Sequence, residues 1–342
     1  MTQRRHKHNL KCPGYRDQRA KRFHGFAVAR YLALICLFSL VSRSPCLAAD
    51  DPPVQLTQAK DEFRVSIGSQ LVARYVYHDD SIPRPYLCDV CTLDGTQVTR
   101  NHPPREGEDL TDHPTYHPGI WMAFGDLGGG DFWRNKASVR QVEILDRARH
   151  GSQPTGFMVR NRYVTDDGPV CDEVCRIEFV PNESGYFVLW TSRFTPSGES
   201  VVFGDQEEMG LGVRLATNLI VKRGGHVLNS HGDRDEAGAW GKQADWCDYS
   251  GTVGGRRLGV LMMPHPDNFR ESWFHVRDYG LLLANPFGRN AFTGEAKSRV
   301  VVRREKPLTL KFGVYVHATS ADGEAFDCSK IYSEYLKRTA TP

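Results

Sequence analysis

The sequence predicts an all-β protein: a large antiparallel two-sheet sandwich with one C-terminal helix. From residue 50 onward, apolar and polar residues mostly alternate, which is the period of a half-buried strand. Clusters of Gly, Pro, Asn and Asp separate the alternating stretches and predict turns. The chain has 342 residues, of which 40% are hydrophobic and 25% charged. This ordinary globular composition excludes disorder, collagen-like repeats and coiled coil.

The first 49 residues predict a signal peptide. The apolar run 31–41 follows a basic stretch, and small residues precede candidate cleavage sites after Ala48 and Ala49. A bilayer span needs about 20 apolar residues, so we expect this run to be removed rather than kept as an anchor. We therefore expect 50–342 to form a single exported β-sandwich domain, periplasmic or extracellular, without a membrane span.

The positive charge of the chain lies mainly in that segment. Its first 49 residues hold ten of the 44 Lys and Arg residues, and Asp17 is the one acidic residue there. The remainder has 34 basic and 40 acidic residues, so the formal net charge changes from +3 to −6. Phosphate repels an acidic protein, and we therefore expect no nucleic-acid partner.

Five alternating stretches mark the clearest strands. In chain order they are 63–67, 71–77, 177–179, 186–190 and 308–316. Turn clusters at 66–68, 166–168, 181–182, 196–198 and 253–256 lie between strands. Near the C-terminus, 321–338 predicts a helix with Asp322 as its N-cap. Its apolar stripe consists of Phe326, Ile331, Tyr332 and Tyr335.

Export changes how the cysteines are interpreted. The residues concerned are Cys88, Cys91, Cys171, Cys175, Cys247 and Cys328. Cys88 and Cys91, like Cys171 and Cys175, are close in the sequence. In an oxidising compartment each pair is a candidate for a local disulfide, although such short bridges need tight turns. Free thiols, or a zinc ion held by the same four residues, are the alternatives. The pairing stays open.

Asp112, His113 and His117 form the first candidate cluster. The neighbouring prolines disfavour a helix, so a loop or strand end must place both imidazoles. Histidine titrates near neutral pH, and the pair is suited to donating protons and hydrogen bonds to a polar ligand. Two alternatives are loop histidines bonded only to backbone, and a metal site. The metal would need a third ligand, for which the candidates are Glu208, His265 and His275.

Tryptophans gather in the same region. Five of the six lie within 112–134 and 240–288. Indole rings beside carboxylate, Arg and Asn residues are typical of sugar-binding sites, while core packing is the alternative for each ring. The glycine-rich stretch 125–131 lacks the Lys-Ser/Thr of a phosphate loop, so a nucleotide site is excluded.

Carboxylates and cations follow on two further strands. Glu208 precedes an alternating run that contains Arg214, which predicts either a buried ion pair or an acid–base group facing the histidines. His275 and Arg277 lie two residues apart, so we expect them to share one face of a strand.

Four motifs together resemble a known family. They are HPGIWMAFGDLGGGDFW, EEMGLGVR, WGKQADWCDYSG and HPDNFRESWFHVRDYGLLLANPFG. They resemble the exported bacterial proteins labelled "methane oxygenase PmoA" family, a domain of unknown function. That family is similar to the galactose-mutarotase-like β-supersandwiches, which include sugar epimerases, glycoside hydrolases and polysaccharide lyases. The resemblance implies a carbohydrate ligand.

The leading hypothesis is an exported carbohydrate-active protein that uses histidine and carboxylate acid–base chemistry as a hydrolase, epimerase or lyase. A lyase would use Tyr249 or His275 as base against a uronic-acid substrate, with Arg84 or Arg277 and Asn268 neutralising its carboxylate. The candidate catalytic residues are His113, His117, Glu208, Asp248 and His275. The candidate substrate-binding residues are Arg84, Asp112, Trp121, Trp133, Arg214, Trp240, Trp246, Tyr249, His265, Asn268, Trp273 and Arg277.

Two other classes of function are alternatives to a carbohydrate-active enzyme. One is a non-catalytic glycan-binding module. The other is the metal-dependent oxygenase that the family label implies. We predict no cofactor, although His113 and His117 are suited to holding a metal ion.

Overall fold

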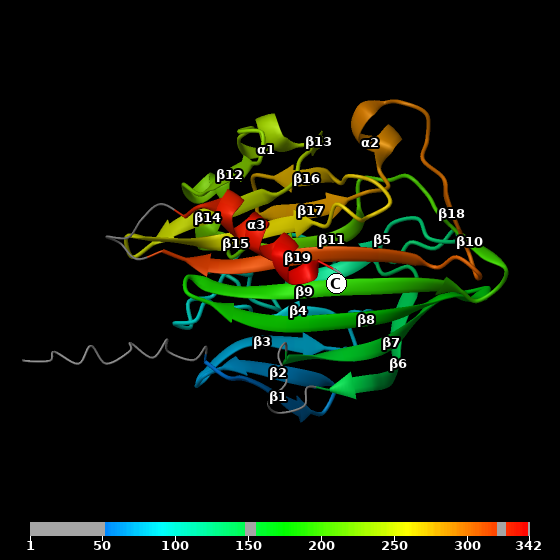
Figure 1. The fold of residues 1–342 in the computed structure, drawn as a ribbon, viewed down its shortest axis with the longest axis horizontal. Coiled ribbons are helices and arrows are strands. Elements are labelled where there is room, and N and C mark those ends of the chain that lie inside the picture. Colours follow the sequence, from blue (N-terminus) through cyan, green and yellow to red (C-terminus); the bar gives the residue numbers. More distant parts are fainter. Residues whose placement is uncertain (1–51, 148–154, 320–325, 341–342) are drawn as a thin grey trace, which may run out of the picture. The chain divides into compact units, whose positions relative to one another are not determined.

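Two large antiparallel sheets, packed face to face, make up most of the computed structural model (Figure 1). It describes residues 52–147, 155–319 and 326–340. The all-β sandwich is confirmed. The signal-peptide prediction for 1–49 lies outside the described residues and stays a prediction.

The nine-stranded sheet has the spatial order β1 (Val54–Ala59), β2 (Glu62–Ile67), β3 (Gln70–Val76), β4 (Tyr86–Cys88), β5 (Ile120–Phe124), β11 (Met209–Arg214), β17 (Leu281–Asn285), β16 (Trp273–Arg277) and β13 (Lys242–Gln243). The eight-stranded sheet has the order β12 (His226–Asn229), β14 (Cys247–Val253), β15 (Arg256–Pro264), β19 (Leu308–Ala318), β9 (Gly185–Pro196), β8 (Gly168–Asn182), β7 (Thr155–Thr165) and β6 (Ser138–Arg147). A ribbon pairs β10 (Ser200–Phe203) with β18 (Val300–Arg303).

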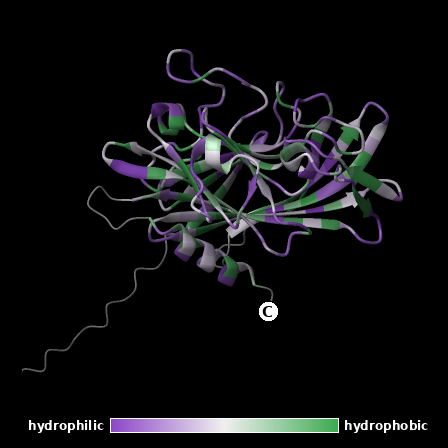
Figure 2. Cartoon of the chain, turned by 90° about the horizontal axis from the view of Figure 1, so that it is seen from above, coloured by the Kyte–Doolittle hydropathy of each residue, from purple (hydrophilic) through white to green (hydrophobic). Residues whose placement is uncertain are grey.

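Apolar side chains from both sheets meet between them. Phe63 and Val65 of β2, and Val314 and Val316 of β19, are buried in one continuous core. Successive residues of a strand point to opposite faces, so alternate positions of every strand supply this core. Figure 2 shows hydrophobic residues along the strands and hydrophilic ones in the loops.

A β-bulge changes the predicted alternation in β3. Leu71 was expected to face the core with Ala73, but its side chain is 38% exposed. Val65 pairs with Ala73 and Ser66 pairs with Leu71, so Val72 is an extra residue on this strand. A bulge of this kind reverses the alternation. The prediction for Leu71 is therefore wrong, and Val72 is buried in its place.

The C-terminal helix is confirmed with a later start. α3 (Cys328–Thr339) is capped by Asp327, whose carboxylate accepts the backbone N–H of Lys330. The predicted cap, Asp322, lies outside the described residues. α3 packs on the outer face of the eight-stranded sheet (Figure 1). It buries Cys328, Ile331 and Tyr335.

Four short helical segments were not predicted. They are α1 (Asp235–Ala239), α2 (Arg289–Thr293) and the 3-10 turns η1 (Thr217–Leu219) and η2 (Val221–Arg223). Within the described residues, every helix is too short or too polar to cross a bilayer.

The six cysteines within the described residues are free thiols. Cys171 and Cys175 lie four residues apart on β8. At about 3.3 Å per residue their Cα atoms are roughly 13 Å apart, whereas a disulfide needs about 7 Å or less. A bridge between these two is therefore excluded. Among the described residues, no cysteine belongs to a cluster suited to zinc.

Candidate functional site

The outer face of the nine-stranded sheet carries most of the predicted site. Trp121 of β5 pairs with Gly212 of β11, which pairs with Leu283 of β17, which pairs with His275 of β16. These four residues form one row across the sheet. Strands lie about 4.8 Å apart, so Trp121 and His275 are roughly 14 Å apart along it.

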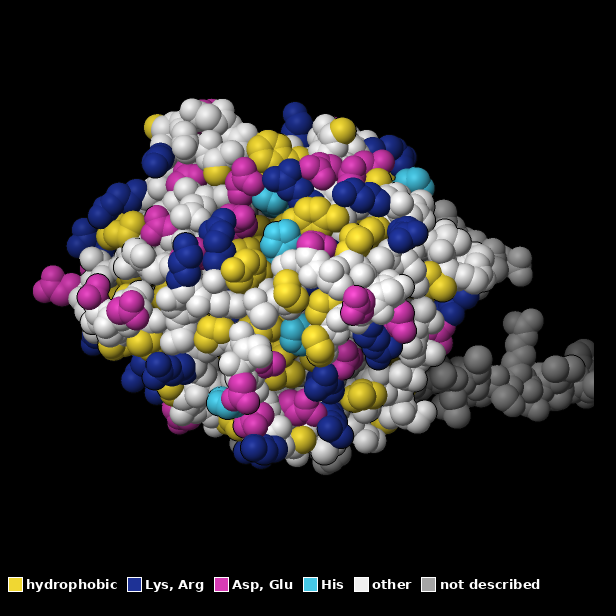
Figure 3. All heavy atoms as spheres, turned by 180° about the vertical axis from the view of Figure 1, so that it is seen from behind, with side chains coloured by type: hydrophobic (Ala, Val, Ile, Leu, Met, Phe, Trp, Pro, Cys, Tyr) yellow, Lys and Arg dark blue, Asp and Glu magenta, His cyan; other side chains and the backbone are white. Residues whose placement is uncertain are grey.

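A second row runs beside the first. Arg214 and Arg277 both pair with Leu281, one from each side. Two strand spacings put their Cα atoms about 10 Å apart. Figure 3 shows this face, with histidine side chains among apolar and charged ones near its centre. As predicted, His275 and Arg277 share one strand face, and the Nε–H of Arg277 donates to Nε2 of His275 at 3.1 Å.

A single turn brings His113 and His117 together. The prolines prevent a full helix, as predicted, but the backbone N–H of His117 donates to the carbonyl of His113. The two imidazole rings therefore stack, with centroids 4.7 Å apart. His117 also stacks on the indole of Trp121 at 5.1 Å. Tyr279 lies parallel to both imidazoles, 5.9 Å from His113 and 6.4 Å from His117.

Asp112 and Arg214 form the central ion pair. Two N–H groups of the guanidinium donate to the two carboxylate oxygens at 2.7 and 2.9 Å. Burial alone would raise the pKa of Asp112, but hydrogen bonds from Arg214 and His113, with the charges of Arg214 and Arg100, hold that pKa well below its usual range. Arg214 also lies over the ring of Tyr279, 4.6 Å from its centroid. Glu208, which the sequence suggested as an ion-pair partner of Arg214, instead pairs with Arg134.

The same guanidinium fixes the tautomer of His117. It lies 3.2 Å from Nδ1 of His117, and a guanidinium can only donate. Nδ1 is therefore the acceptor, and the neutral ring carries its proton on Nε2. Burial and the charge of Arg214 lower the pKa of His117 well below its usual value, which keeps the ring neutral.

Two buried arginines hold the loops over the sheet. Arg100 donates to the backbone carbonyls of Leu110, Asp112, His113 and His117. Arg84 donates to the carbonyls of Tyr116, Phe132 and Trp133 and to the amide oxygen of Asn135. Both guanidinium groups therefore bind main chain rather than face solvent.

A second cluster surrounds Arg277. Its guanidinium contacts Glu236 at 2.7 Å and Glu207 at 3.3 Å. It also lies 5.8 Å from the ring centroid of Trp240. Nδ1 of His275 is 3.4 Å from the Glu207 carboxylate, yet it is buried and makes no hydrogen bond.

Glu207 and His275 have shifted pKa values. Burial, with the nearby charge of Glu208, raises the pKa of Glu207 against the opposing effect of Arg277. Burial, followed by the charge of Arg277, lowers the pKa of His275 to about 3. His275 is therefore neutral at physiological pH. Since its Nε2 accepts from Arg277, its proton is on Nδ1.

The two clusters adjoin. Glu208 forms an ion pair with Arg134 at 2.5 Å, and Glu207, the preceding residue, contacts Arg277. Burial raises the pKa of Tyr279, while the charges of both Arg214 and Arg277 oppose that shift. Tyr279 contacts the first cluster directly, since it lies beside both imidazoles and under the guanidinium of Arg214, and it follows Arg277 by two residues.

The candidate metal ligands do not fit a cation. Ligand atoms of Asp112, His113 and His117 lie within 4.8 Å of one another. However, Arg214 donates to both Asp112 oxygens and to Nδ1 of His117. A divalent ion at these atoms would lie against a buried guanidinium, which disfavours it.

The tryptophans are mostly buried, which corrects the expected stacking role. Trp121 and Trp133 are 0% and 2% exposed, and their rings pack against each other with centroids 5.2 Å apart. Trp273 is also buried, beside Phe292 of α2. Trp240 is only partly buried, and its Nε1–H has no partner among the described residues.

Five predicted site residues lie elsewhere. Asp248 is fully buried on the eight-stranded sheet, where Ser250, Arg257 and His317 bind its carboxylate. The others belong to the inter-sheet core, to the α3 contact or to the loop after β15: Tyr249, Trp246, His265 and Asn268. All five lie on or next to β14 and β15 of the eight-stranded sheet, so the sheet order separates them from the site.

Five polar residues of the site were not predicted from the sequence as site residues. They are Arg100, Arg134, Glu207, Glu236 and Tyr279. Glu207 stands next to a predicted residue, and Tyr279 lies two residues after Arg277, so proximity was an available signal. Glu236 lies on α1, for which no helical pattern was found.

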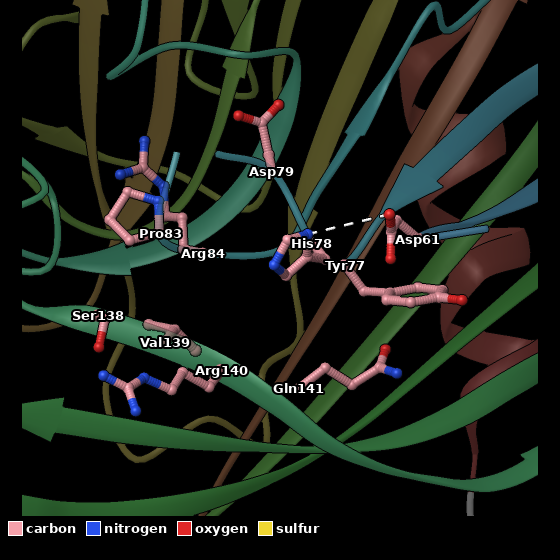
Figure 4. Close-up of a pocket in the computed structure, with 10 residues that line it drawn as sticks. All are labelled: Asp61, Tyr77, His78, Asp79, Pro83, Arg84, Ser138, Val139, Arg140 and Gln141. Carbon is pink, nitrogen blue, oxygen red and sulfur yellow. Dashed lines mark ion pairs between the residues drawn. The ribbon is translucent and has the colours of Figure 1, made fainter. Parts of the chain in front are cut away.

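A separate cavity of about 560 Å³ lies beside Arg84. Figure 4 shows its lining from the turn between β1 and β2, the loop after β3, and β6, with His78 directed toward Asp61. Nδ1 of His78 is 4.0 Å from the Asp61 carboxylate. Arg84 is the one predicted site residue in its lining.

A model of the family of unknown function DUF6807 matches residues 62–328. The chain belongs to this family. The match covers both sheets and both clusters. A search of the curated proteins finds no match to this DUF6807 chain. The family description contains no oxygenase label, so that activity stays a prediction.

Solved structures similar to the DUF6807 chain are distant. A galactose mutarotase-like protein from Lactobacillus casei covers 78% of this chain and 100% of its own, with 10% identity and a TM-score of 0.38. A 4-α-glucanotransferase from Thermococcus litoralis covers 78% of this chain and 39% of its own, with 9% identity and a TM-score of 0.28.

A human-microbiome protein described as a kojibiose phosphorylase covers 83% of this chain, with 9% identity and a TM-score of 0.36. This chain spans 32% of that protein's length. These similarities concern the fold and carry no inference about activity.

Proposed function

We propose that this DUF6807 protein is an exported carbohydrate-active enzyme that binds a sugar on the outer face of the nine-stranded sheet. Glu207 carries the proposal. It is a partly exposed carboxylic acid whose pKa is raised, and it lies beside the neutral imidazole of His275. A general acid needs its pKa shifted toward the working pH.

In this proposal Glu207 donates a proton to a ring oxygen or a leaving oxygen of the sugar. Arg277 holds the carboxyl group and can stabilise the carboxylate that remains. The Nε2–H of His117 binds a sugar hydroxyl group, because this ring is neutral and its Nδ1 already accepts from Arg214. In hydrolysis the protonated leaving oxygen separates from the anomeric carbon and water adds in its place. The products of the activity screen distinguish this reaction from epimerisation and elimination.

The test is an activity screen of residues 50–342 on oligosaccharides, followed by Glu207→Gln. Loss of a general acid reduces turnover by about 10²- to 10⁴-fold. The matched control is Glu305→Gln, because Glu305 is exposed in the turn after β18. Wild-type turnover by a folded Glu207→Gln protein would remove Glu207 from the mechanism.

A second candidate is a glycan-binding module without turnover, and Trp240 favours it. This indole is partly exposed, although its Nε1–H is buried without a partner among the described residues. The exposed part of an indole ring can stack on the apolar face of a sugar. Calorimetry with wild type and Trp240→Ala separates the two candidates, since binding without product in the activity screen would support the module.

A further inference from the structure

We infer that the ligand of this face is a neutral sugar rather than a uronate or a sulfated sugar. The inference rests on the proposed carbohydrate function and specifies its substrate class. It is carried by the state of the arginines in the site, each of which already has acceptors in the protein.

Arg214 shows this most directly. Its two terminal nitrogens reach both oxygens of Asp112, and its side chain is 1% exposed. A bidentate pair of this geometry is what a guanidinium offers to a substrate carboxylate. Asp112 occupies that place, so an anionic sugar could bind Arg214 only by displacing Asp112.

Arg277 and Arg134 are also paired. Arg277 lies between Glu236 and Glu207, and Arg134 contacts Glu208 at 2.5 Å. A substrate carboxylate brought to Arg277 would meet the Glu236 carboxylate, and one brought to Arg134 would meet the Glu208 carboxylate. Like charges at this distance repel, so the second cluster disfavours an anion.

The remaining two guanidinium groups are engaged with main chain. Arg84 and Arg100 donate to loop carbonyls and are 3% and 1% exposed. Turning either toward a ligand would release the loop that carries His113 and His117. A lyase arrangement with Arg84 or Arg277 neutralising a uronate is therefore disfavoured, and Asn268 lies outside this face.

The donors that lack partners are uncharged. Nδ1–H of His275 and Nε1–H of Trp240 are buried and make no hydrogen bond to described residues, so a sugar reaches them only after a neighbouring side chain moves. Nε2–H of His117 makes no hydrogen bond to the described residues either, whereas its Nδ1 is bound by Arg214. Neutral N–H groups pair well with hydroxyl and ether oxygens, which are the acceptors of a neutral sugar.

The experiment is an array of glycans probed with wild type and Glu207→Gln, residues 50–342. Its neutral arm holds β-glucan, xylan, mannan and galactan oligosaccharides. Its acidic arm holds alginate, polygalacturonate, glucuronoxylan and sulfated galactan oligosaccharides. We expect the hits to be neutral, with at least tenfold weaker binding of a uronate-substituted oligosaccharide than of its unsubstituted counterpart.

Glu236→Gln sharpens the test because it removes one negative charge from Arg277 and keeps a hydrogen-bond acceptor. We expect it to raise the affinity for acidic oligosaccharides relative to neutral ones by about tenfold, while Glu305→Gln leaves the ratio unchanged. Preference of the wild type for acidic glycans would overturn the inference and leave the proposed function standing. Absence of glycan binding and of turnover would overturn the proposed function itself.

Discussion

Replacing Asp112 by Asn tests the ion pair at the centre of the site. The change removes the negative charge but keeps the size of the side chain and one hydrogen-bond acceptor. Arg214 then stays buried, with a single amide oxygen and Nδ1 of His117 as its acceptors. We expect the variant to fold with reduced stability, because a buried guanidinium loses its counter-charge.

The magnitude follows from the burial of the two partners. Breaking a buried ion pair from one side destabilises a protein by about 3–5 kcal/mol. Arg214 is 1% exposed, but Asp112 is 36% exposed, so water screens its side of the pair. Asn also retains part of the hydrogen bonding. We therefore expect a loss at the low end, about 2–3 kcal/mol in the free energy of unfolding.

Urea unfolding, followed by tryptophan fluorescence between pH 3 and pH 8, measures this loss. The pKa of Asp112 is lower in the folded state than in the unfolded state, where it is about 3.9. Its contribution is therefore complete above about pH 5 and declines as pH falls through the folded pKa. The gap between wild type and Asp112→Asn should narrow below about pH 4.

Asp167→Asn is the control, because Asp167 is exposed in the turn between β7 and β8. The reasoning is refuted if Asp112→Asn matches this control at pH 7, or if a loss of stability stays constant down to pH 3.

Two further changes test the packing at Gly212 and the pKa of Glu173. Gly212→Ala places a Cβ 3.0 Å from Cζ2 of Trp121, so we expect a loss of about 1–3 kcal/mol in the free energy of unfolding, measured in urea. Gly198→Ala, whose Cβ would meet open space, should be nearly neutral, and equal stabilities of the two variants would contradict the crowding at Gly212. Burial raises the pKa of Glu173 in the sandwich core, so its contribution is complete below about pH 4.3 and declines as pH rises. Wild type should therefore lose stability relative to Glu173→Gln between pH 4.5 and 7, and a constant difference would contradict a raised pKa.

The fold could be predicted because one period dominates the chain. Alternation at 63–67 and 308–316 reports burial on one side, and that signal survives without knowledge of the partner strand. Leu71 shows the limit: a bulge depends on the pairing of two strands, and neither strand alone indicates it. The short helices α1 and α2 also escaped prediction, since five residues hold too little periodicity to be detected.

The site could be predicted only where strands place it. Trp121, Arg214, His275 and Arg277 share one face because alternation and the sheet order put them there. Asp248 has the same kind of sequence neighbourhood, yet it belongs to the other sheet. The polar and aromatic composition predicted both groups of residues as parts of one site. The order of the strands, which a local stretch of sequence does not specify, places Asp248 on the other sheet.

The choice between Glu207 and Glu208 depends on a single residue step. Both residues lie in the bend before β11, where their carboxylates reach different partners: Glu208 contacts Arg134, and Glu207 contacts Arg277. The sequence analysis assigned the acid–base role to Glu208. The raised pKa of Glu207 and its position beside His275 favour the preceding residue. A shift of one position thus transfers the proposed proton donor from the loop at 131–134 to the row of β16, where the unpartnered neutral donors of His275 and Trp240 lie.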